Sequence, residues 1–210
     1  MENIKIIPFN IMILSTLADM VRDAWHLEKS IKNKFLLKMA CTAYSAHIIS
    51  KSNYIHFLKS GSNIVSFLAA RKENRHIYLR YFYLLICFIA VFFMLFYKDG
   101  RSLLKYQLGY NKMLEDLYKK AGKKYDAEMV LFITYTKHQN KGYGKKLVEK
   151  FNIDMKKENI KTIYLFTDNY CDYEMYERAG CRRVCDMGKE FLFTDDVFCQ
   201  EIYLYEYEIK

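Results

Sequence analysis

Proline and glycine are scarce in this chain. Its 210 residues include one proline, Pro8, and eight glycines. Segments rich in these two residues are typical of linkers and low-complexity regions, so their scarcity argues against a long disordered or linking segment. Apolar residues make up 52% of the chain and charged residues 27%, as in globular proteins. The sequence therefore predicts one folded domain over residues 1–210.

Cysteine patterns typical of zinc sites are also missing. The six cysteines form no C-x-x-C pair and have no histidine at ligand spacing, so we expect no metal site. We expect reduced thiols, with Cys181 and Cys185 on one face of a strand. The N-terminal segment lacks a basic n-region and a small-residue cleavage site, so no signal peptide is predicted. These features favour a cytoplasmic protein, and the wealth of Lys, Ile, Asn and Tyr is typical of an AT-rich bacterial genome.

The chain carries an excess of positive charge. The formal net charge is +9 at pH 7. Such a charge favours anionic partners, which include nucleic acid, phosphate-bearing ligands and anionic membrane surfaces. Net charge alone does not choose among these partners, so the choice depends on local patterns.

Hydrophobic periodicity predicts a chain that mixes strands and helices. The expected strands cover residues 3–9, two segments joined by a turn within 53–73, then 127–136, 161–168, 181–186, 190–194 and 200–209. The expected helices cover residues 14–27, 32–49, 141–159 and 169–180. In the last helix, Asn169 is expected to cap the start and Gly180 to end it. This order predicts a mixed α/β fold in which helices flank a central sheet.

A basic, glycine-spaced loop separates the strand at 127–136 from the next helix. It reads "HQNKGYGKKL" from His138 to Leu147. Backbone N–H groups at a helix N-terminus favour an anionic ligand, and phosphate is the natural candidate. Gly142 and Gly144 would let the backbone approach it closely, while neighbouring lysines add positive charge.

Two common nucleotide motifs do not fit this loop. A P-loop requires a Lys followed by Ser or Thr after its last glycine, and here two lysines follow Gly144. The dinucleotide fingerprint requires a third glycine, where this chain has Leu147.

Two motifs resemble those of one enzyme family. "QNKGYG", residues 139–144, fits the [QR]-x-x-G-x-[GA] signature of the GNAT N-acetyltransferase superfamily and lies between a strand and a helix. In the later segment, Asn169, Tyr176 and Gly180 are spaced as in the family's last helix. The resemblance implies a GNAT-like fold with a mostly antiparallel sheet, and it implies acetyl-CoA or coenzyme A as cofactor.

The resemblance also implies roles for individual residues. Main-chain groups at Leu131 and Ile133 would bind the pantetheine arm, where this strand separates from the strand at 161–168. The coenzyme A pyrophosphate would be held by N–H groups of the loop residues Gln139, Asn140, Lys141, Gly142, Tyr143, Gly144 and Lys145.

The catalytic residues follow from the same resemblance. Asn169 would contact the pantetheine arm, and Tyr176 would give a proton to the departing thiolate. An N–H near Ile133 would polarise the thioester carbonyl. Glu128 is the first candidate for the base, with a solvated glutamate at a strand edge as the alternative interpretation.

Two residues depart from the family pattern. Many members have proline where this chain has Tyr135, and an aromatic residue where it has Cys181. Both differences concern packing near the acyl group and leave room for a weak or specialised catalyst.

An insert over residues 77–124 separates two strands that the family joins by a short turn. Its segment 81–97 is uncharged and apolar, and it just reaches the ~17 residues needed to cross a bilayer. A single crossing would put two paired strands on opposite sides of the membrane, and the second half of the insert is charged. We therefore expect a helical hairpin turning near Asp99 and Gly100. The second helix, a partner subunit in a homodimer or a membrane surface would cover its apolar helix.

Three functions fit these observations. The first is an acetyl-CoA-dependent N-acetyltransferase that modifies a primary amine of a small molecule or peptide. The second is a non-catalytic acyl-CoA binder or sensor, and the third is a membrane-surface interaction protein that uses the insert. Nucleic acid is not an expected partner, because the phosphates of the cofactor already account for the loop lysines.

Overall fold

The computed structural model describes residues 4–8, 13–72, 80–193 and 196–209. The ends of the first expected strand, residues 77–79 of the insert and residue 194 lie outside these ranges. The described strands form one sheet of seven in the order β1-β2-β3-β4-β5-β7-β6. Their bounds are β1 Ile4–Pro8, β2 Tyr54–Ser60, β3 Asn63–Lys72, β4 Ala127–Thr134, β5 Thr162–Asp168, β6 Arg182–Phe193 and β7 Asp196–Glu208.

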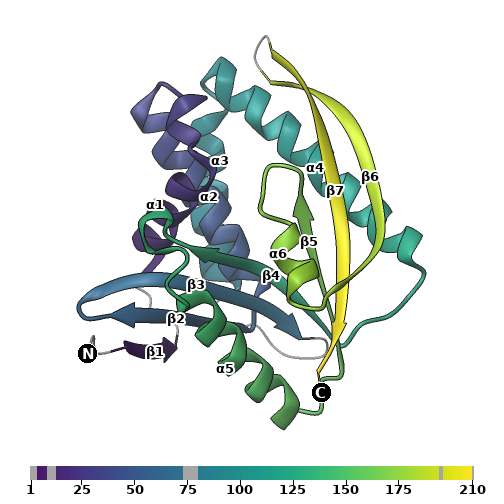
Figure 1. Ribbon diagram of the computed structural model, residues 1–210. Coiled ribbons are helices and arrows are strands. Elements are labelled where there is room, and N and C mark those ends of the chain that lie inside the picture. The colour runs from purple at the N-terminus through teal and green to yellow at the C-terminus, as the bar shows by residue number, and fades with distance from the viewer. Residues whose placement is uncertain (1–3, 9–12, 73–79, 194–195, 210) are drawn as a thin grey trace.

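Helices cover both faces of this sheet (Figure 1). Helix α5 packs on one face, while α1, α2, α3 and α4 lie against the other. The bounds are α1 Leu14–Trp25, α2 Lys34–Lys51, α3 Arg80–Met94, α4 Lys98–Ala121, α5 Tyr143–Lys157 and α6 Glu174–Arg178, with short 3-10 turns at η2 Leu27–Lys29 and η3 Thr136–His138. The predicted mixed α/β fold, with helices flanking a mostly antiparallel sheet, is confirmed.

Alternating side chains divide the core between the two faces. On β5, Ile163 and Leu165 pack toward α5, whereas Tyr164 packs toward α4. Phe151 on α5 has no exposed surface, because the apolar residues of this helix recur every three or four positions on one side. The helix predicted over residues 141–159 therefore faces the sheet as its sequence pattern indicates.

The sequence-based expectations were wrong at the C-terminal end. Residues 182–186 and 190–193 of the two expected strands belong to one strand, β6, whose pairing with β7 shifts between Arg183 and Cys185. This bulge reverses the alternation of side chains. Cys181 packs in the α5 cluster and Cys185 in the α4 cluster, so the two thiols do not share a face.

The last helix is also shorter than expected. It begins only at Glu174, and the residue in its N-cap position is Tyr173 rather than Asn169. Gly180 follows the helix, as predicted. Asn169 lies five residues before the helix, so it cannot cap the first turn.

Both helices expected in the insert are present, but they pack on different parts of the protein. Helix α3 lies on α2 through Tyr83, Ala90 and Met94, and α4 lies on β6 and β7. The connection between the helices is at residues 95–97, whereas Asp99 and Gly100 already belong to the first turn of α4. Of the three covers expected for the apolar helix, the second helix is therefore not the one. None of the described helices combines the length and apolar content needed to cross a membrane.

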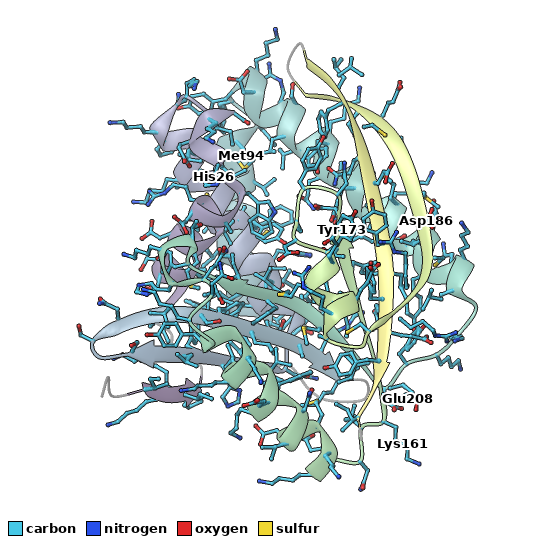
Figure 2. All side chains as sticks on the ribbon, viewed as in Figure 1. His26, Met94, Lys161, Tyr173, Asp186 and Glu208 are labelled. Carbon is cyan, nitrogen blue, oxygen red and sulfur yellow. The ribbon has the colours of Figure 1, made fainter. Side chains whose placement is uncertain are left out.

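Strand β4 pairs with β5 in parallel over only three residues. Ala127, Glu128 and Met129 oppose Ile163, Tyr164 and Leu165, and no register continues beyond them. Asp126 anchors this junction, since its Oδ2 accepts hydrogen bonds from the N–H groups of Lys161 at 2.9 Å and Thr162 at 2.8 Å. Figure 2 shows Lys161 at the same end of the sheet as Glu208, which pairs with Thr162.

We predict that Asp126→Ala lowers the free energy of unfolding by about 1–2 kcal/mol near neutral pH. The hydrogen bond from the Thr162 N–H, then that from Lys161, lowers the pKa of Asp126. A lowered carboxyl pKa adds stability that is present above the unfolded value near ~4 and is lost as the pH falls through the folded value. Urea unfolding should therefore show the difference between wild type and variant shrinking below about pH 4.

Asp116→Ala is the matched control for this prediction. The Asp116 side chain is 44% exposed and lies 4.0 Å from Lys119, so its loss should leave stability nearly unchanged. Equal effects of the two substitutions would contradict a special role of Asp126.

Candidate active site

The backbone of β4 opens toward β5 after Met129. A bulge against β3 makes Val130 the extra residue, because Ala70 pairs with Met129 and Ala69 with Leu131. Beyond this bulge, β4 runs on to Thr134 without pairing to β5. Bulges bend a strand and redirect its side chains, so the separation of the two strands is built into the sheet.

Two hydrogen bonds show which groups of β4 face the opening. The Tyr135 N–H donates to Val65 O at 3.0 Å, and the Ser66 hydroxyl donates to Ile133 O at 3.1 Å, so the backbone of both residues is directed at β3. Successive residues of a strand direct their backbone groups to opposite sides. The groups that face the opening therefore belong to Phe132 and Thr134, one residue away from the expected Leu131 and Ile133.

The side chains of Leu131 and Ile133 are buried on the α1 and α2 side of the sheet. The sequence identified the strand that separates from β5. It did not identify which residues of that strand direct their backbone groups into the opening, because the bulge at Val130 is invisible in the sequence.

The glycine-spaced loop lies directly at this opening. Gly142 has a φ of +77° and precedes the first turn of α5. A Cβ on Gly144 would lie 2.8 Å from Phe132 Cζ and 3.4 Å from Thr134 Oγ1, so the helix start packs against the open part of β4. Tyr143 is buried, with its hydroxyl 3.2 Å from Ser60 Oγ at the end of β2.

The loop presents positive potential to solvent. Gly142 has no side chain with which to cap α5, so the first N–H groups of the helix are available to an anion. The exposed Lys141, Lys145 and Lys146 surround this point. Upstream, the Thr136 N–H donates to Asp23 Oδ2 at 2.8 Å, which fixes the loop to α1. Exposed Gln139 and Asn140 complete the turn.

Asn169 connects β5 to β7. Its Oδ1 accepts a hydrogen bond from the Glu201 N–H at 3.0 Å, and its Nδ2 donates to Cys199 O at 3.4 Å. The side-chain amide of Asn169 thus links the residue after β5 to β7 by hydrogen bonds. In this arrangement Asn169 acts on the strand β7, and its side chain is already occupied at both ends.

Tyr176 lies half-buried on α6, beside the part of β7 that pairs with the middle of β5. Its ring packs on Tyr205, with the centroids 5.9 Å apart. Burial raises the pKa of Tyr176, and the nearby Cys171, Cys181 and Asp168 raise it further. Its phenol is therefore protonated at physiological pH. Tyr173, labelled in Figure 2, lies one turn earlier and packs on Tyr203 of β7 at 4.9 Å.

Glu128 is buried rather than solvated at a strand edge. Its carboxylate lies 2.8 Å from Arg71 Nη2 and 3.9 Å from Lys51 Nζ. It pairs across the sheet with Arg71 on one side and Tyr164 on the other, two residues before the bulge. Burial lowers the pKa of Lys51, whereas Glu128 raises it. Glu128 therefore lies in a charged cluster on the paired part of β4, two residues before the strand separates from β5.

A group of tyrosines at the end of β5 was missed by sequence reasoning. The Tyr110 hydroxyl donates to Asp168 Oδ2 at 3.3 Å, and the Tyr106 hydroxyl donates to Gln200 Oε1 at 3.0 Å. Burial raises the pKa of Tyr44 on α2, and Cys171, Asp168 and Tyr106 add to this effect. Tyr106 and Tyr110 are spaced by four residues in the insert, a pattern that signals one helix face but not its partner.

Solved structures match this chain over almost its full length, although no family model and no curated protein matches its sequence. An N-acetyltransferase from Staphylococcus aureus Mu50 is 8% identical, with a TM-score of 0.54 and 99% of each chain covered. The ribosomal-protein-S18-alanine N-acetyltransferase from Escherichia coli is 11% identical, with a TM-score of 0.52 over 99% of this chain and 95% of that one. The yncA protein from Salmonella typhimurium, solved with its cofactor acetyl-CoA, is 8% identical, with a TM-score of 0.52 over 99% and 94%.

The chain has the GNAT acetyltransferase fold. The match covers 99% of this chain, so it includes the seven-stranded sheet and the loop before α5. Within this GNAT fold, the opening of β4 and the loop at Gly142 lie at the C-terminal end of β4, and Tyr176 lies on the helix that follows β5.

We predict that Glu128→Ala lowers the free energy of unfolding by about 2 kcal/mol, because Arg71 and Lys51 lose the buried carboxylate between them. Glu128→Gln should cost less, since its amide oxygen can still accept a hydrogen bond from Arg71. Urea unfolding of both variants measures the difference. Glu115→Ala, at an exposed position on α4, is the control, and a wild-type stability of Glu128→Ala would show that the cluster does not support the fold.

Proposed function

We propose that this protein is an N-acetyltransferase that uses acetyl-CoA to acetylate a primary amine of a small molecule or peptide. The observation that carries the proposal is the open edge of β4 beside a lysine-surrounded helix N-terminus. A ligand that fits both needs amides for the strand and a diphosphate for the loop, and coenzyme A has both. The GNAT fold supports the same cofactor, since yncA was solved with acetyl-CoA.

The residues present fit this group. On the open side of β4, the Phe132 C=O and the Thr134 N–H would bind the pantetheine amides as a neighbouring strand would. The Thr134 C=O accepts a hydrogen bond from Gln139 Nε2 at 3.4 Å. The N–H groups at the start of α5, from Tyr143 to Lys145, would bind the pyrophosphate, together with those of Gln139 to Gly142. Nothing lies within 4 Å of a Cβ placed on Gly142, so its surroundings are open on the ligand side.

Bound acetyl-CoA supplies an activated acetyl thioester to which an amine can add. The backbone N–H on the open side of β4 nearest the bulge, that of Phe132, would stabilise negative charge on the carbonyl oxygen. Tyr176 would hold the proton that the departing thiolate requires, because its raised pKa keeps the phenol protonated. Glu128 would accept the proton of the amine through water, with Arg71 holding its carboxylate in place.

The acceptor would enter from the side of the sheet that carries α2 and α4. Tyr44, Tyr110 and Asp168 lie on that side at the end of β5. They present phenol hydroxyls and a carboxylate, which are hydrogen-bond partners for an ammonium or amine. The ribosomal-protein-S18-alanine N-acetyltransferase shows that this fold can act on a protein amine, which supports a peptide acceptor as one of the two classes.

A non-catalytic acyl-CoA binder is the second candidate. The observation that favours it is the ion pairing of Glu128 with two cations, which already engage the carboxylate oxygens that a catalytic water would have to reach. Both candidates require the same binding site, so only turnover separates them.

We predict that calorimetric titration detects saturable binding of acetyl-CoA and that Gly142→Glu abolishes it, because the side chain adds a negative charge at the pyrophosphate position. Gly122→Glu is the matched control. Gly122 also has a positive φ, +62°, and a Cβ placed there would meet nothing within 4 Å, but it follows α4 far from the loop in sequence. Loss of binding in both variants, or in neither, would contradict the assignment of the loop.

Tyr176→Phe should bind acetyl-CoA like wild type but release thiol at least ~100-fold more slowly with an amine acceptor, since the general acid is lost. Tyr173→Phe on the same segment is the control and should retain the wild-type rate. Binding without any thiol release by the wild type across primary amines would favour the acyl-CoA binder, and an unchanged rate in Tyr176→Phe would exclude Tyr176 as the acid.

A further inference from the structure

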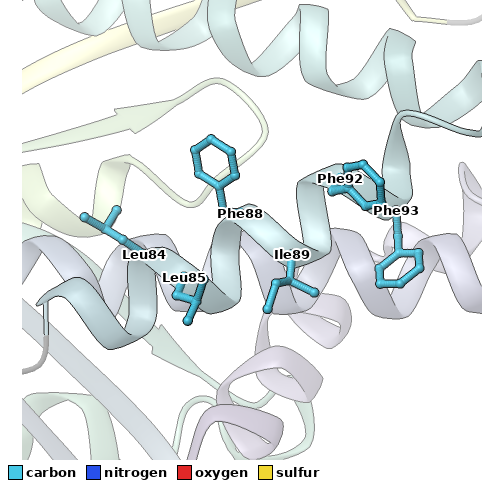
Figure 3. A pocket seen from close by; sticks show the side chains of 6 residues that line it. All are labelled: Leu84, Leu85, Phe88, Ile89, Phe92 and Phe93. Carbon is cyan, nitrogen blue, oxygen red and sulfur yellow. The ribbon is translucent and has the colours of Figure 1, made fainter.

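The outer face of α3 is apolar and exposed along its length. Figure 3 shows Leu84, Leu85, Phe88, Ile89, Phe92 and Phe93 on successive turns of this helix, where they line a shallow hollow. Phe88 is 78% exposed, Leu85 60% and Phe92 54%. Contiguous apolar surfaces of this kind mark interaction sites on soluble domains.

A different face of α3 attaches this helix to the rest of the fold. Helix α3 is held to α2 by its opposite face, where Tyr83, Ala90 and Met94 are buried. Helix α4 leaves the outer face uncovered, since it packs on β6 and β7 instead. More than half of the Phe88 and Phe92 side-chain surface is therefore exposed within the described part of the chain.

The surface continues onto the beginning of α2. Phe35 is 44% exposed, and its ring lies 5.9 Å from that of Phe93 and 6.1 Å from that of Tyr97. Leu95 and Phe96, which connect α3 to α4, are exposed as well. We call the outer face of α3 together with Phe35, Leu95 and Phe96 the α3 surface.

The segments that carry the α3 surface are rich in exposed cations. From Arg80 to Lys112 the only acidic residue in the sequence is Asp99, and from Ile31 to Ser45 there is none. The exposed cations of these segments are Lys32, Lys34, Lys38, Arg80, Lys98, Arg101, Lys105 and Lys112. Arg101 also donates to Leu95 O at 2.8 Å, which places its charge at the C-terminal end of α3.

An apolar surface such as this one can be covered by a second copy of the chain or by a membrane. The basic residues beside it favour the membrane. A second copy related by a twofold axis would bring the same surface against itself, so that the basic margins of both copies would meet and repel each other. An anionic lipid surface provides the opposite charge at the margin and an apolar layer beneath it. Phenylalanine and leucine between lysine and arginine are typical of helices that lie in a membrane interface.

We propose that the α3 surface binds anionic lipid bilayers, with α3 lying along the interface and its phenylalanines in the acyl boundary. The helix has 15 residues, about 22 Å of length, which is shorter than the ~30 Å apolar layer and suits an orientation in the plane. The binding is separate from the acetyl-CoA site, because α3 and the loop at Gly142 are on opposite faces of the sheet.

Co-sedimentation of the full chain with lipid vesicles tests this proposal. We expect binding to vesicles of equimolar phosphatidylcholine and phosphatidylserine at low salt, at least ~10-fold weaker binding to phosphatidylcholine alone, and weakening by salt. The double variant Phe88→Ser/Phe92→Ser should lose at least ~10-fold in affinity. The control Leu192→Ser/Val197→Ser removes two residues of similar exposure, 61% and 68%, from the β6–β7 hairpin and should bind like wild type.

Two further variants separate insertion from charge attraction. Lys98→Gln/Lys105→Gln should weaken binding, whereas Lys156→Gln/Lys157→Gln at the far end of α5 should not. Phe88→Trp should show a shift of its emission to shorter wavelength when vesicles are added, over the constant contribution of Trp25, the only natural tryptophan.

The proposal is overturned if the folded wild-type chain fails to bind the anionic vesicles, or if the Phe88→Ser/Phe92→Ser variant binds as tightly as wild type. It is also overturned if sedimentation equilibrium shows a dimer that the same variant converts to a monomer, since a second copy would then cover the surface. Loss of acetyl-CoA binding in Gly142→Glu should leave vesicle binding unchanged, so the two sites can fail independently.

Discussion

The limited parallel pairing of β4 with β5 is the constraint on which the rest of this structure depends. Asp126 fastens the two strands at one end, and the bulge at Val130 turns β4 away three residues after they meet. Unpaired backbone groups are costly unless a partner is supplied. The opening therefore fits a ligand that carries amides, and the start of α5, packed on Phe132 through Gly144, fits the anionic end of that ligand.

The insert between β3 and β4 adds two helices outside the sheet. Its second helix, α4, packs on β6 and β7 and brings Tyr106 and Tyr110 to the end of β5, next to Asp168 and Gln200. Its first helix packs on α2 and leaves its phenylalanines outside. One segment thus contributes to the side from which an acceptor would approach and to a separate surface with the character of a membrane-binding face. If both proposals hold, an amine at or near a lipid surface is a natural class of acceptor.

Much of this architecture could be predicted from the sequence. Apolar patterns located the first five strands and, through residues recurring every three or four positions, the helix α5. The spacing of Gln139, Gly142 and Gly144 located the loop. The features that could not be predicted depend on bulges in the strands. The bulge at Val130 moved the open backbone groups from Ile133 to Phe132, and a second bulge separated Cys181 from Cys185. Long-range contacts were also invisible, because the buried pairing of Glu128 with Arg71 and Lys51 joins three elements.

Amide hydrogen exchange on β4, resolved by residue, tests the central claim most directly. In the free protein, the N–H groups of Ile133 and Tyr135 should exchange slowly because they face β3, whereas those of Phe132 and Thr134 should exchange faster. Saturating acetyl-CoA should slow exchange at Phe132 and Thr134 and at the first turn of α5, with little change at Ile133 and Tyr135. Unchanged exchange at Phe132 and Thr134 in the presence of bound acetyl-CoA would contradict the assignment of the opening as the cofactor site.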